Sequence, residues 1–454
     1  MQLRNWQLEC SNQAVDSFSL GQKHFLALAT PGSGKTIMAA HIAKQLFENN
    51  MIDYVICFAP SVAVTNSMRT SFAHVLRKPM HGYLGAAGGV FTYQYLASSK
   101  KADWSFLKKS RVLVVFDEIH HCGGDDTNMA NAWGREVLLN IKQHANYMLS
   151  MTGTPWRTDM APITLASYLE PDMIIQCDYT YGITSAIRDK VCRTPEVILI
   201  DNDKLQVNAE SFGSLQIALE QSSLRYSEIL TDDNAVRYLL SKAVQQLKQA
   251  RIEQPNAGGL VVARSVEHAK HIMRMLRKDF NQSAVLVTYM EPAPQDVIEQ
   301  FRTSNTQWIV SVSMVSEGTD IPRLRVCAHL SMVRTELFFR QVLGRILRMM
   351  PNIRNNKAWL FSFAERSLLE YAQQLQQDIP ESIIKYDSYK DIFLDTKPTG
   401  KNPLKLLPQP NDIFSGTQLG DWAIKDNPND SDTSITQLLF SLQGRYRQQV
   451  FSIF

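Results

Sequence analysis

The sequence predicts an α/β protein built from two parallel sheets in tandem, followed by a small C-terminal extension. Short apolar runs of strand length alternate with stretches of helical periodicity, and the runs form two series separated by a region of different texture. Continuous apolar runs are typical of strands covered on both faces, as in a parallel sheet flanked by helices. A chain of 454 residues is also too long for one core, so two or three domains are expected.

The first series of predicted strands follows an amphipathic helix that is predicted within residues 3–18. Its apolar runs lie at 25–28, 54–58, 112–116 and 147–151. Ligands gather at the carboxyl ends of the strands in parallel sheets. The residues that follow each run are therefore the first candidates for a functional site.

A glycine-rich stretch follows the first of these strands. Residues 29–36 read Ala-Thr-Pro-Gly-Ser-Gly-Lys-Thr, and a predicted helix continues to residue 48. Glycines let backbone N–H groups turn toward a polyphosphate, and the N-terminus of a helix carries partial positive charge. Lys35 adds a full charge near the β- and γ-phosphates, and the Thr36 hydroxyl can bind Mg²⁺. The stretch predicts a nucleotide phosphate-binding loop, with Ala29 in place of the usual first glycine.

Two acidic residues, Asp117 and Glu118, follow the third strand. A carboxylate beside a phosphate loop can hold Mg²⁺ directly or through water, and a second one can orient and deprotonate an attacking water. One alternative is a solvated acidic turn, which the preceding apolar run disfavours. Another is a metal site, which is disfavoured because adjacent residues rarely all point at one ion. Its candidate ligands are His120, His121, Cys122, Asp125 and Asp126.

The second series of predicted strands lies in the C-terminal half, where helical stretches at 265–280 and 293–302 separate some of them. This alternation again predicts a parallel sheet. The strands are expected at 259–263, 284–287, 308–312, 326–330 and 358–363.

The change in amino-acid pattern between the two series of predicted strands indicates domain boundaries. The middle region is expected to bridge two lobes, with a strand at 196–200 and a helix at 233–252. The end of the chain is rich in Pro, Gly and polar residues, and its last piece, 435–454, is expected to be helix-like and to dock back or contact a partner. The predicted units are 1–178, 179–257, 258–394 and 395–454.

The second half carries two further motifs and no second phosphate loop. Residues 316–320 read Ser-Glu-Gly-Thr-Asp after a predicted strand, and residues 340–348 lie in a predicted helix. Within this helix Gln341, Arg345 and Arg348 are spaced i, i+4 and i+7, which places them on one face. Because the rest of the helix is apolar, the polar stripe indicates an interface more than simple solvation.

Composition narrows the class of protein only a little. The chain is 44% hydrophobic and 20% charged, as in an ordinary globular protein, and its net charge of +3 neither proves nor excludes binding to nucleic acid. Six cysteines without a CxxC pair argue against a zinc ribbon or a disulfide framework and suit a reducing cytoplasm. The N-terminus lacks the apolar core of a signal peptide and no run of 18 apolar residues exists, so we expect a cytoplasmic protein without a membrane partner.

Six separated motifs, in order, together resemble superfamily 2 helicases of the DEAD/DEAH type, close to the branch that includes restriction-enzyme motor subunits. The resemblance covers about residues 1–375, and the acidic motif reads Asp-Glu-Ile-His, which makes it DExH. It implies two RecA-like lobes with ATP and Mg²⁺ in the cleft between them. The motifs are Gln7 and residues 29–36, 117–120, 152–155, 316–320 and 341–348.

The resemblance also implies a role for individual residues. Gln7 would read adenine, whereas without the resemblance a surface glutamine beside a packing tryptophan is the simpler interpretation. Mg²⁺ would be held by Thr36 and Asp117. The residues implied in catalysis are Lys35, Asp117, Glu118, Gln341, Arg345 and Arg348, the last two as arginine fingers. The residues implied in ATP binding are Gln7, Pro31, Gly32, Ser33, Gly34, Lys35, Thr36, Gly318 and Asp320.

Two further groups of residues follow from the resemblance. His120, Thr152 and Thr154 would couple the nucleotide state to lobe movement, although the two threonines alone would predict only a hydrogen-bonded turn. Nucleic acid would lie across both lobes and be held mainly through its phosphates. The candidate contacts are Ser61, Arg69, Thr92, Tyr93, Gln94, Arg264, Ser265 and Thr319.

The leading hypothesis is therefore a nucleic-acid-stimulated ATPase that unwinds DNA or translocates on it. An RNA-directed motor is the alternative enzyme, since the motifs do not separate DNA from RNA. A third hypothesis is an ATP-gated clamp or sensor subunit of a larger defence or repair complex, with little unwinding of its own. The C-terminal extension is the expected contact for a protein partner.

Overall fold

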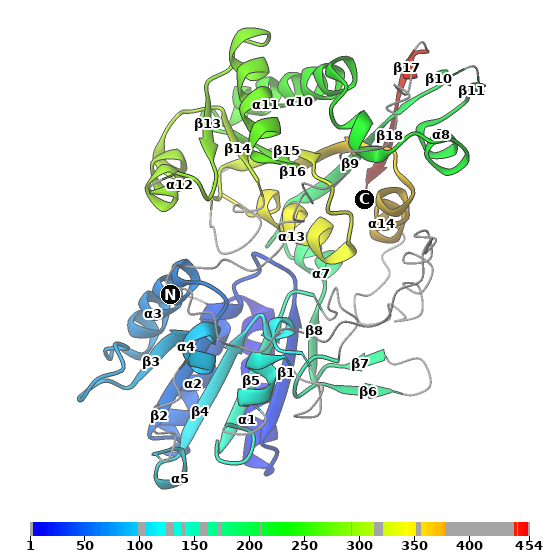
Figure 1. Ribbon diagram of the computed structural model, residues 1–454. Coiled ribbons are helices and arrows are strands. Elements are labelled where there is room, and N and C mark those ends of the chain that lie inside the picture. The colour runs from blue at the N-terminus through cyan, green and yellow to red at the C-terminus, as the bar shows by residue number, and fades with distance from the viewer. Residues whose placement is uncertain are drawn as a thin grey trace.

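The computed structural model describes two α/β lobes that follow one another along the chain, the first coloured mainly blue to cyan and the second mainly green to yellow, with its last strand in red (Figure 1). This confirms the predicted fold class. The described residues are 3–98, 106–123, 131–137, 141–154, 162–169, 174–208, 210–291, 293–312, 321–350, 356–376, 440–442 and 444–452.

The first lobe is built on six parallel strands in the order β3-β2-β4-β5-β1-β8. Helices α1, α2 and α3 pack side by side against this sheet. The strands are β1 (His24–Ala29), β2 (Tyr54–Ala59), β3 (Gly88–Thr92), β4 (Val112–Asp117), β5 (Tyr147–Thr152) and β8 (Tyr179–Tyr181). The helices are α1 (Asn5–Ser19), α2 (Lys35–Glu48) and α3 (Val62–Leu76).

All four strands predicted for this part are confirmed as β1, β2, β4 and β5. The sequence did not reveal β3, which begins with two glycines, a residue of low strand propensity. It did not reveal β8 either, because three residues are too few for a visible apolar run.

The second lobe is built on seven strands in the order β13-β14-β12-β15-β16-β9-β18. All pairs are parallel except the last, and all predicted strands of this part are confirmed. The strands are β9 (Thr194–Asn202), β12 (Gly258–Ala263), β13 (Ala284–Val287), β14 (Trp308–Ser311), β15 (Leu324–Leu330), β16 (Lys357–Phe363) and β18 (Tyr446–Ser452). The helices are α10 (Asp233–Glu253), α11 (Val266–Lys278), α12 (Pro294–Thr303), α13 (Glu336–Ile346) and α14 (Arg366–Gln376).

Short elements connect and extend these two sheets. Strands β6 and β7 form an antiparallel pair, and β10 pairs with β11 and β17. These strands are β6 (Ser167–Leu169), β7 (Ile174–Gln176), β10 (Leu205–Val207), β11 (Glu210–Phe212) and β17 (Phe440–Leu442). The short helices are α4 (Tyr93–Ser98), α5 (Phe106–Lys109), η1 (Ile119–His121), α6 (Ala132–Glu136), α7 (Ile183–Arg188), α8 (Leu215–Gln221) and α9 (Tyr226–Ile229).

The segment expected as a bridge, 179–257, is shared between the two sheets. It begins with β8 at the edge of the first sheet, continues through α7, and enters the second sheet as β9. The connection between the lobes is therefore short and lies around α7. The domain boundaries themselves remain a prediction.

The expectation of a helix-like piece at 435–454 is wrong for the residues that the structure describes there. They form β17 and β18, and β18 pairs antiparallel with β9 at the edge of the second sheet. Tyr446 of β18 also stacks on Tyr238 of α10, with ring centroids 4.2 Å apart. The open edge of β9 supplies backbone partners that local sequence periodicity cannot reveal.

Two expectations from composition can be compared with the structure. All six cysteines are free thiols. Among the described residues, no helix has both the length and the apolar character needed to cross a membrane.

Arg193 connects the segment after α7 to the end of α13. Its side chain is 1% exposed, and its guanidinium donates to the carbonyl oxygens of Leu324, Ile346 and Pro322 at 2.6, 3.1 and 3.1 Å. Burial, with the nearby charge of Arg325, lowers the pKa of Arg193 to about 9, so the guanidinium stays protonated at neutral pH. Arg193 therefore fixes the last turn of α13, whose carbonyl groups have no intrahelical partner.

We predict that Arg193→Met lowers the free energy of unfolding by about 2–4 kcal/mol, because two buried carbonyl groups and one half-buried carbonyl group lose their donor. Denaturant unfolding followed by circular dichroism measures the change. Arg274→Met, on the exposed face of α11, is the matched control and should change stability by less than about 0.5 kcal/mol. Equal stability of the two variants would contradict this role.

Candidate functional site

The glycine-rich stretch forms a loop between β1 and α2. Gly32 and Gly34 have φ angles of 81° and 98°, in the left-handed region that favours glycine. Lys35 and Thr36 open α2, so their N–H groups are among the first of the helix and lack intrahelical acceptors. The Ser33 hydroxyl is buried without a hydrogen-bond partner among the described residues. A loop with these donors is suited to hold a phosphate group.

Lys35 joins this loop to the acidic pair. Its Nζ donates to the Ala29 carbonyl oxygen at 3.1 Å and lies 3.0 Å from Glu118 Oε1. Burial and then the Glu118 charge raise the pKa of Asp117 to about 7. Burial also acts to raise the pKa of Glu118, but Lys35 and His120 outweigh it and hold that pKa well below its ordinary value. At neutral pH, therefore, Glu118 carries the firmly held negative charge.

The residues expected to couple nucleotide state to movement do lie together. His120 Nδ1 is 2.9 Å from Thr152 Oγ1 and 3.3 Å from Thr154 Oγ1, and all three side chains are buried. The backbone N–H of Gly153 donates to Glu118 Oε2 at 3.0 Å. The turn after β5 is thus tied directly to the acidic pair after β4. The coupling role of these residues remains a prediction.

The second lobe reaches the phosphate loop through the end of α13. A Cβ atom placed on Gly32 would lie 3.2 Å from Cγ of Arg348. A Cβ atom placed on Gly344 would lie 2.7 Å from Cβ of Pro31. The Sγ atom of Cys192 lies 3.9 Å from the Pro31 carbonyl oxygen. The phosphate loop and the arginine-bearing motif, which lie in opposite halves of the sequence, therefore meet in space.

The arginine-bearing motif is only partly helical, which corrects the expectation for residues 340–348. Gln341 and Arg345 lie on α13, which ends at Ile346, and both are half-buried. Arg348 follows the helix and forms an isolated β-bridge with Cys192. Its partial burial lowers the pKa of Arg348 to about 10, which leaves the guanidinium charged at neutral pH. The arginine thus approaches the loop from a fixed strand-like segment.

Gln7 is buried against the phosphate loop. Its Nε2 donates to the Gly34 carbonyl oxygen at 2.9 Å, and its Oε1 accepts from the backbone N–H of Arg4 at 2.9 Å. Gln7 is 4% exposed and so is not the surface residue that its sequence neighbours alone suggested. Its reading of adenine remains a prediction.

The candidate contacts for nucleic acid lie at the carboxyl ends of other strands. Ser61 caps α3 after β2, and Ser265 caps α11 after β12, so the two serines hold equivalent places in the two lobes. Thr92 ends β3, and Gln94 beside it is exposed. Arg69 is held by the carbonyl oxygen of Val90 at 3.1 Å, and the exposed Arg264 by that of Ser227 at 3.3 Å.

Tyr93 is the exception among these candidates. Its side chain is fully buried, so the expectation that it contacts nucleic acid directly is wrong. Its ring stacks on Phe58 and Trp133, which lie far from Tyr93 along the sequence.

Two glycines at this site were not given a role by the sequence. A Cβ atom on Gly153 would lie 3.0 Å from Lys35 Nζ, and one on Gly344 would meet Pro31. The available signals were a glycine between two strand-end threonines and a glycine inside an apolar helix. Each glycine lets a residue that is distant along the chain approach the backbone closely.

Some expected residues cannot be placed. Pro155 and the motif with Gly318, Thr319 and Asp320 lie outside the described residues, as do Asp125 and Asp126 of the alternative metal site. Within the described part of the chain, no group of three His, Cys, Asp or Glu side chains is arranged to hold a metal ion.

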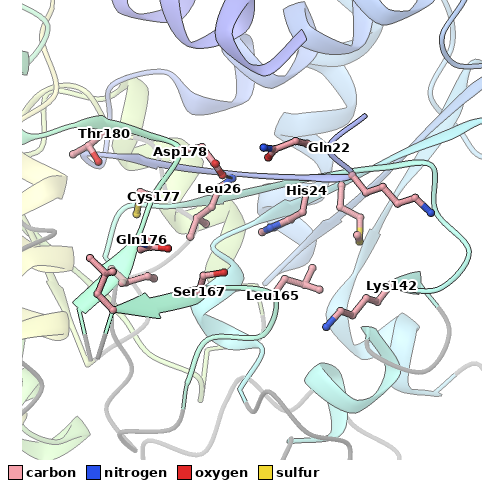
Figure 2. Close-up of a pocket in the computed structure, with 14 residues that line it drawn as sticks. Gln22, His24, Leu26, Lys142, Leu165, Ser167, Gln176, Cys177, Asp178 and Thr180 are labelled. Atoms are coloured by element: carbon pink, nitrogen blue, oxygen red, sulfur yellow. Dashed lines mark hydrogen bonds between the residues drawn. The ribbon is translucent and has the colours of Figure 1, made fainter. Parts of the chain in front are cut away.

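A separate pocket of about 860 Å³ lies on the first lobe, between β1, β5 and the β6–β7 pair (Figure 2). His24, at the beginning of β1, lines it, whereas the phosphate loop follows the other end of this strand. His24 Nε2 lies 2.8 Å from Ser150 Oγ, and burial together with Lys142 lowers the pKa of His24 to about 4. The pocket is lined by none of the site residues that were predicted from the sequence.

We predict that Gly344→Ala slows the nucleotide hydrolysis implied by the motifs roughly tenfold, because an overlap of this kind opposes the contact between the lobes by about 1–3 kcal/mol. Nucleotide binding should change less, since the new Cβ would press on Pro31 and leave Lys35 and the N-terminus of α2 unchanged. Steady-state turnover and binding of a fluorescent ATP analogue measure the two effects. Gly213→Ala is the control, since its new Cβ would meet nothing within 4 Å. Unchanged turnover in Gly344→Ala would argue against the contact.

Two family models match the two parts of the chain that contribute to this site. Residues 1–157 match the family described as the type III restriction enzyme res subunit, and residues 241–350 match the helicase conserved C-terminal domain. An uncharacterised protein of Mycobacterium leprae is 30% identical over 397 residues, which cover 82% of this chain and 64% of the relative. A Schizosaccharomyces pombe protein named as a mitochondrial ATP-dependent helicase is 23% identical over 77% of this chain and 55% of its own. The chain thus spans about three fifths of these relatives.

Solved structures share the fold. A fragment of an HsdR subunit of a type I restriction enzyme from Vibrio vulnificus has a TM-score of 0.57 at 17% identity, over 83% of this chain and 67% of that one. The type ISP restriction-modification enzyme LlaBIII bound to DNA has a TM-score of 0.52 at 14% identity, over 80% of this chain and 27% of that one. With its two RecA-like lobes, the protein belongs to the superfamily 2 helicases, in the restriction-enzyme-like branch.

Proposed function

We propose that this protein is a nucleic-acid-stimulated ATPase that couples ATP hydrolysis between its two lobes to unwinding of DNA or translocation on it. The contact of Arg348 and Gly344 with the phosphate loop is the observation that carries the proposal. The site is then complete only when both lobes take part, so a change in lobe position can control hydrolysis.

The residues of the first lobe are suited to bind a nucleotide and to activate a water molecule for attack. Lys35 and the first N–H groups of α2 would hold the phosphates, and Glu118 would orient and deprotonate the attacking water. The transition state spreads negative charge over the transferred phosphoryl group. Arg345 and Arg348, from the second lobe, would stabilise that charge, and arginines in this role contribute roughly 10³–10⁵ in rate in other systems.

The oxygen-bearing side chains of Asp117 and Thr36 also fit a magnesium ion. Asp117 is a buried carboxyl with a raised pKa, and opposite charge next to it would favour its ionised form. Thr36 opens α2 beside the loop and carries the hydroxyl that this ion takes in such sites. The ion would neutralise phosphate charge, while Lys35 and Glu118 remain the groups that bind and move a proton.

Nucleic acid would bind across both lobes at the carboxyl ends of β2, β3 and β12. Ser61 and Ser265 offer the N-termini of α3 and α11 to phosphate groups, and the polar side chains of Thr92 and Gln94 lie nearby in sequence at the end of β3. Contacts of this kind are tolerant of sequence. The relatives whose names include restriction enzymes favour DNA over RNA as the proposed substrate.

The decisive experiment measures ATP hydrolysis with single-stranded DNA, duplex DNA and RNA, followed by a strand-separation assay. We expect stimulation by DNA, because a strand bound across both lobes would hold Arg348 against the phosphate loop. Stimulation by RNA alone would replace the DNA motor by an RNA motor. Stimulation by DNA without separation or movement would favour an ATP-gated clamp, and no stimulation by any polynucleotide would overturn the proposal.

We predict that Glu118→Gln lowers turnover by at least about 10²-fold, because a general base typically contributes 10²–10⁴ in rate. The variant should still bind ATP and hold nucleic acid, whereas Lys35→Ala should lose both ATP binding and turnover. Glu48→Gln, at the exposed end of α2, is the control and should behave as the parent protein. Parent-like turnover in Glu118→Gln would remove Glu118 from water activation.

A further inference from the structure

Tyr93 connects the end of β3 to the end of β4, two places in the first lobe to which the proposed function gives different roles. It lies at the junction of β3 and α4, between Thr92 and Gln94. In the sheet, β2 separates β3 from β4. The Tyr93 hydroxyl nevertheless donates to the carbonyl oxygen of Asp117, at the end of β4, at 2.9 Å. The side chain therefore crosses β2 and reaches the acidic pair.

The hydrogen bond acts on the peptide group that joins the two catalytic carboxylates. Because the Asp117 carbonyl belongs to the peptide between Asp117 and Glu118, its orientation helps set where the Glu118 side chain begins. Glu118 itself has a φ of 52°, a conformation that is unfavourable for a non-glycine residue and persists only when its surroundings hold it. Burial raises the pKa of Tyr93 well above its ordinary value, so the hydroxyl remains a donor at neutral pH.

Aromatic packing holds the tyrosine ring in place. Phe58 of β2 stacks on it with centroids 6.4 Å apart, and Trp133 of α6 stacks on it at 5.4 Å with an interplanar angle of 16°. Helix α6 is in turn tied to the segment after Glu118, because the Asn131 side chain donates to the His121 carbonyl oxygen at 2.8 Å. Displacement of the start of α4 therefore has to move the ring or strain the bond to Asp117.

We propose that Tyr93 is a positioning residue that transmits the binding of nucleic acid at the end of β3 to the catalytic carboxylates through its hydroxyl. The inference rests on the proposed function, because it assumes that a strand contacts Thr92 and Gln94. A strand held at these residues fixes the start of α4, and the tyrosine then fixes the Asp117–Glu118 peptide in the orientation that hydrolysis needs. Tyr93 touches neither nucleotide nor nucleic acid in this arrangement.

The test compares Tyr93→Phe, which removes only the hydroxyl, with the parent protein and with Tyr54→Phe. Tyr54 begins β2 at the opposite end of the same sheet and is exposed, so its hydroxyl should not matter. Turnover is measured without and with single-stranded DNA, together with KM for ATP and the Kd for that DNA. For Tyr93→Phe we expect the ratio of stimulated to basal kcat to fall roughly five- to tenfold, as the loss of one hydrogen bond allows, at unchanged KM and Kd.

Each other outcome overturns the inference in a recognisable way. If basal and stimulated kcat fall by the same factor, the hydroxyl serves only the fold of the site. If Kd rises while the ratio is kept, Tyr93 supports binding and not transmission. If single-stranded DNA does not stimulate the parent protein, nothing remains to be transmitted and the inference falls, while the duplex DNA and RNA assays show whether the proposed function falls too. Thermal unfolding of both variants confirms that they are folded.

Discussion

Two neighbouring carboxyl groups, the buried Asp117 and the half-buried Glu118, lie at the end of β4, and the arrangement of the site depends on this constraint. Like charges at adjacent positions cannot both be held at low cost away from water. The structure resolves the conflict unevenly. Glu118 receives Lys35, His120 and the Gly153 N–H, whereas burial and its neighbour raise the pKa of Asp117. The pKa values of the two carboxyls are thereby shifted in opposite directions, which suits the different roles proposed for them.

The same constraint explains why a second lobe is useful. Lys35 lies 3.0 Å from Glu118, so part of its charge already balances a protein carboxylate. A nucleotide triphosphate would bring several more negative charges to the loop. Arg348, which lies against Gly32, supplies positive charge that does not come from the first lobe. The electrostatic balance of the proposed reaction therefore supports a site that is shared between the lobes.

Sequence reasoning succeeded where chemistry requires particular residues in a fixed local pattern. The phosphate loop, the acidic pair and the strand-end threonines follow buried strands, so hydrophobic runs and motifs support one another. It failed where the partner is distant along the chain. β18 exists because β9 offers an open edge, Arg348 leaves the helix because Cys192 bridges it, and Tyr93 is buried because Phe58 and Trp133 cover it. None of these partners lies within a local window of the sequence.

The strand order of the first sheet accounts for a division of labour along its carboxyl edge. The proposed nucleotide-binding groups follow β1, β4 and β5, which are neighbours, whereas the candidate nucleic-acid contacts follow β2 and β3 at one side. A ligand held after β2 lies next to β4, whereas a ligand held after β3 can act on β4 through groups that cross β2. Backbone pairing cannot make that connection, because hydrogen bonds of a sheet join adjacent strands only. A long, rigid side chain with a polar end can make it, and among the described residues that follow β3, Tyr93 has this form and a bonded partner on β4.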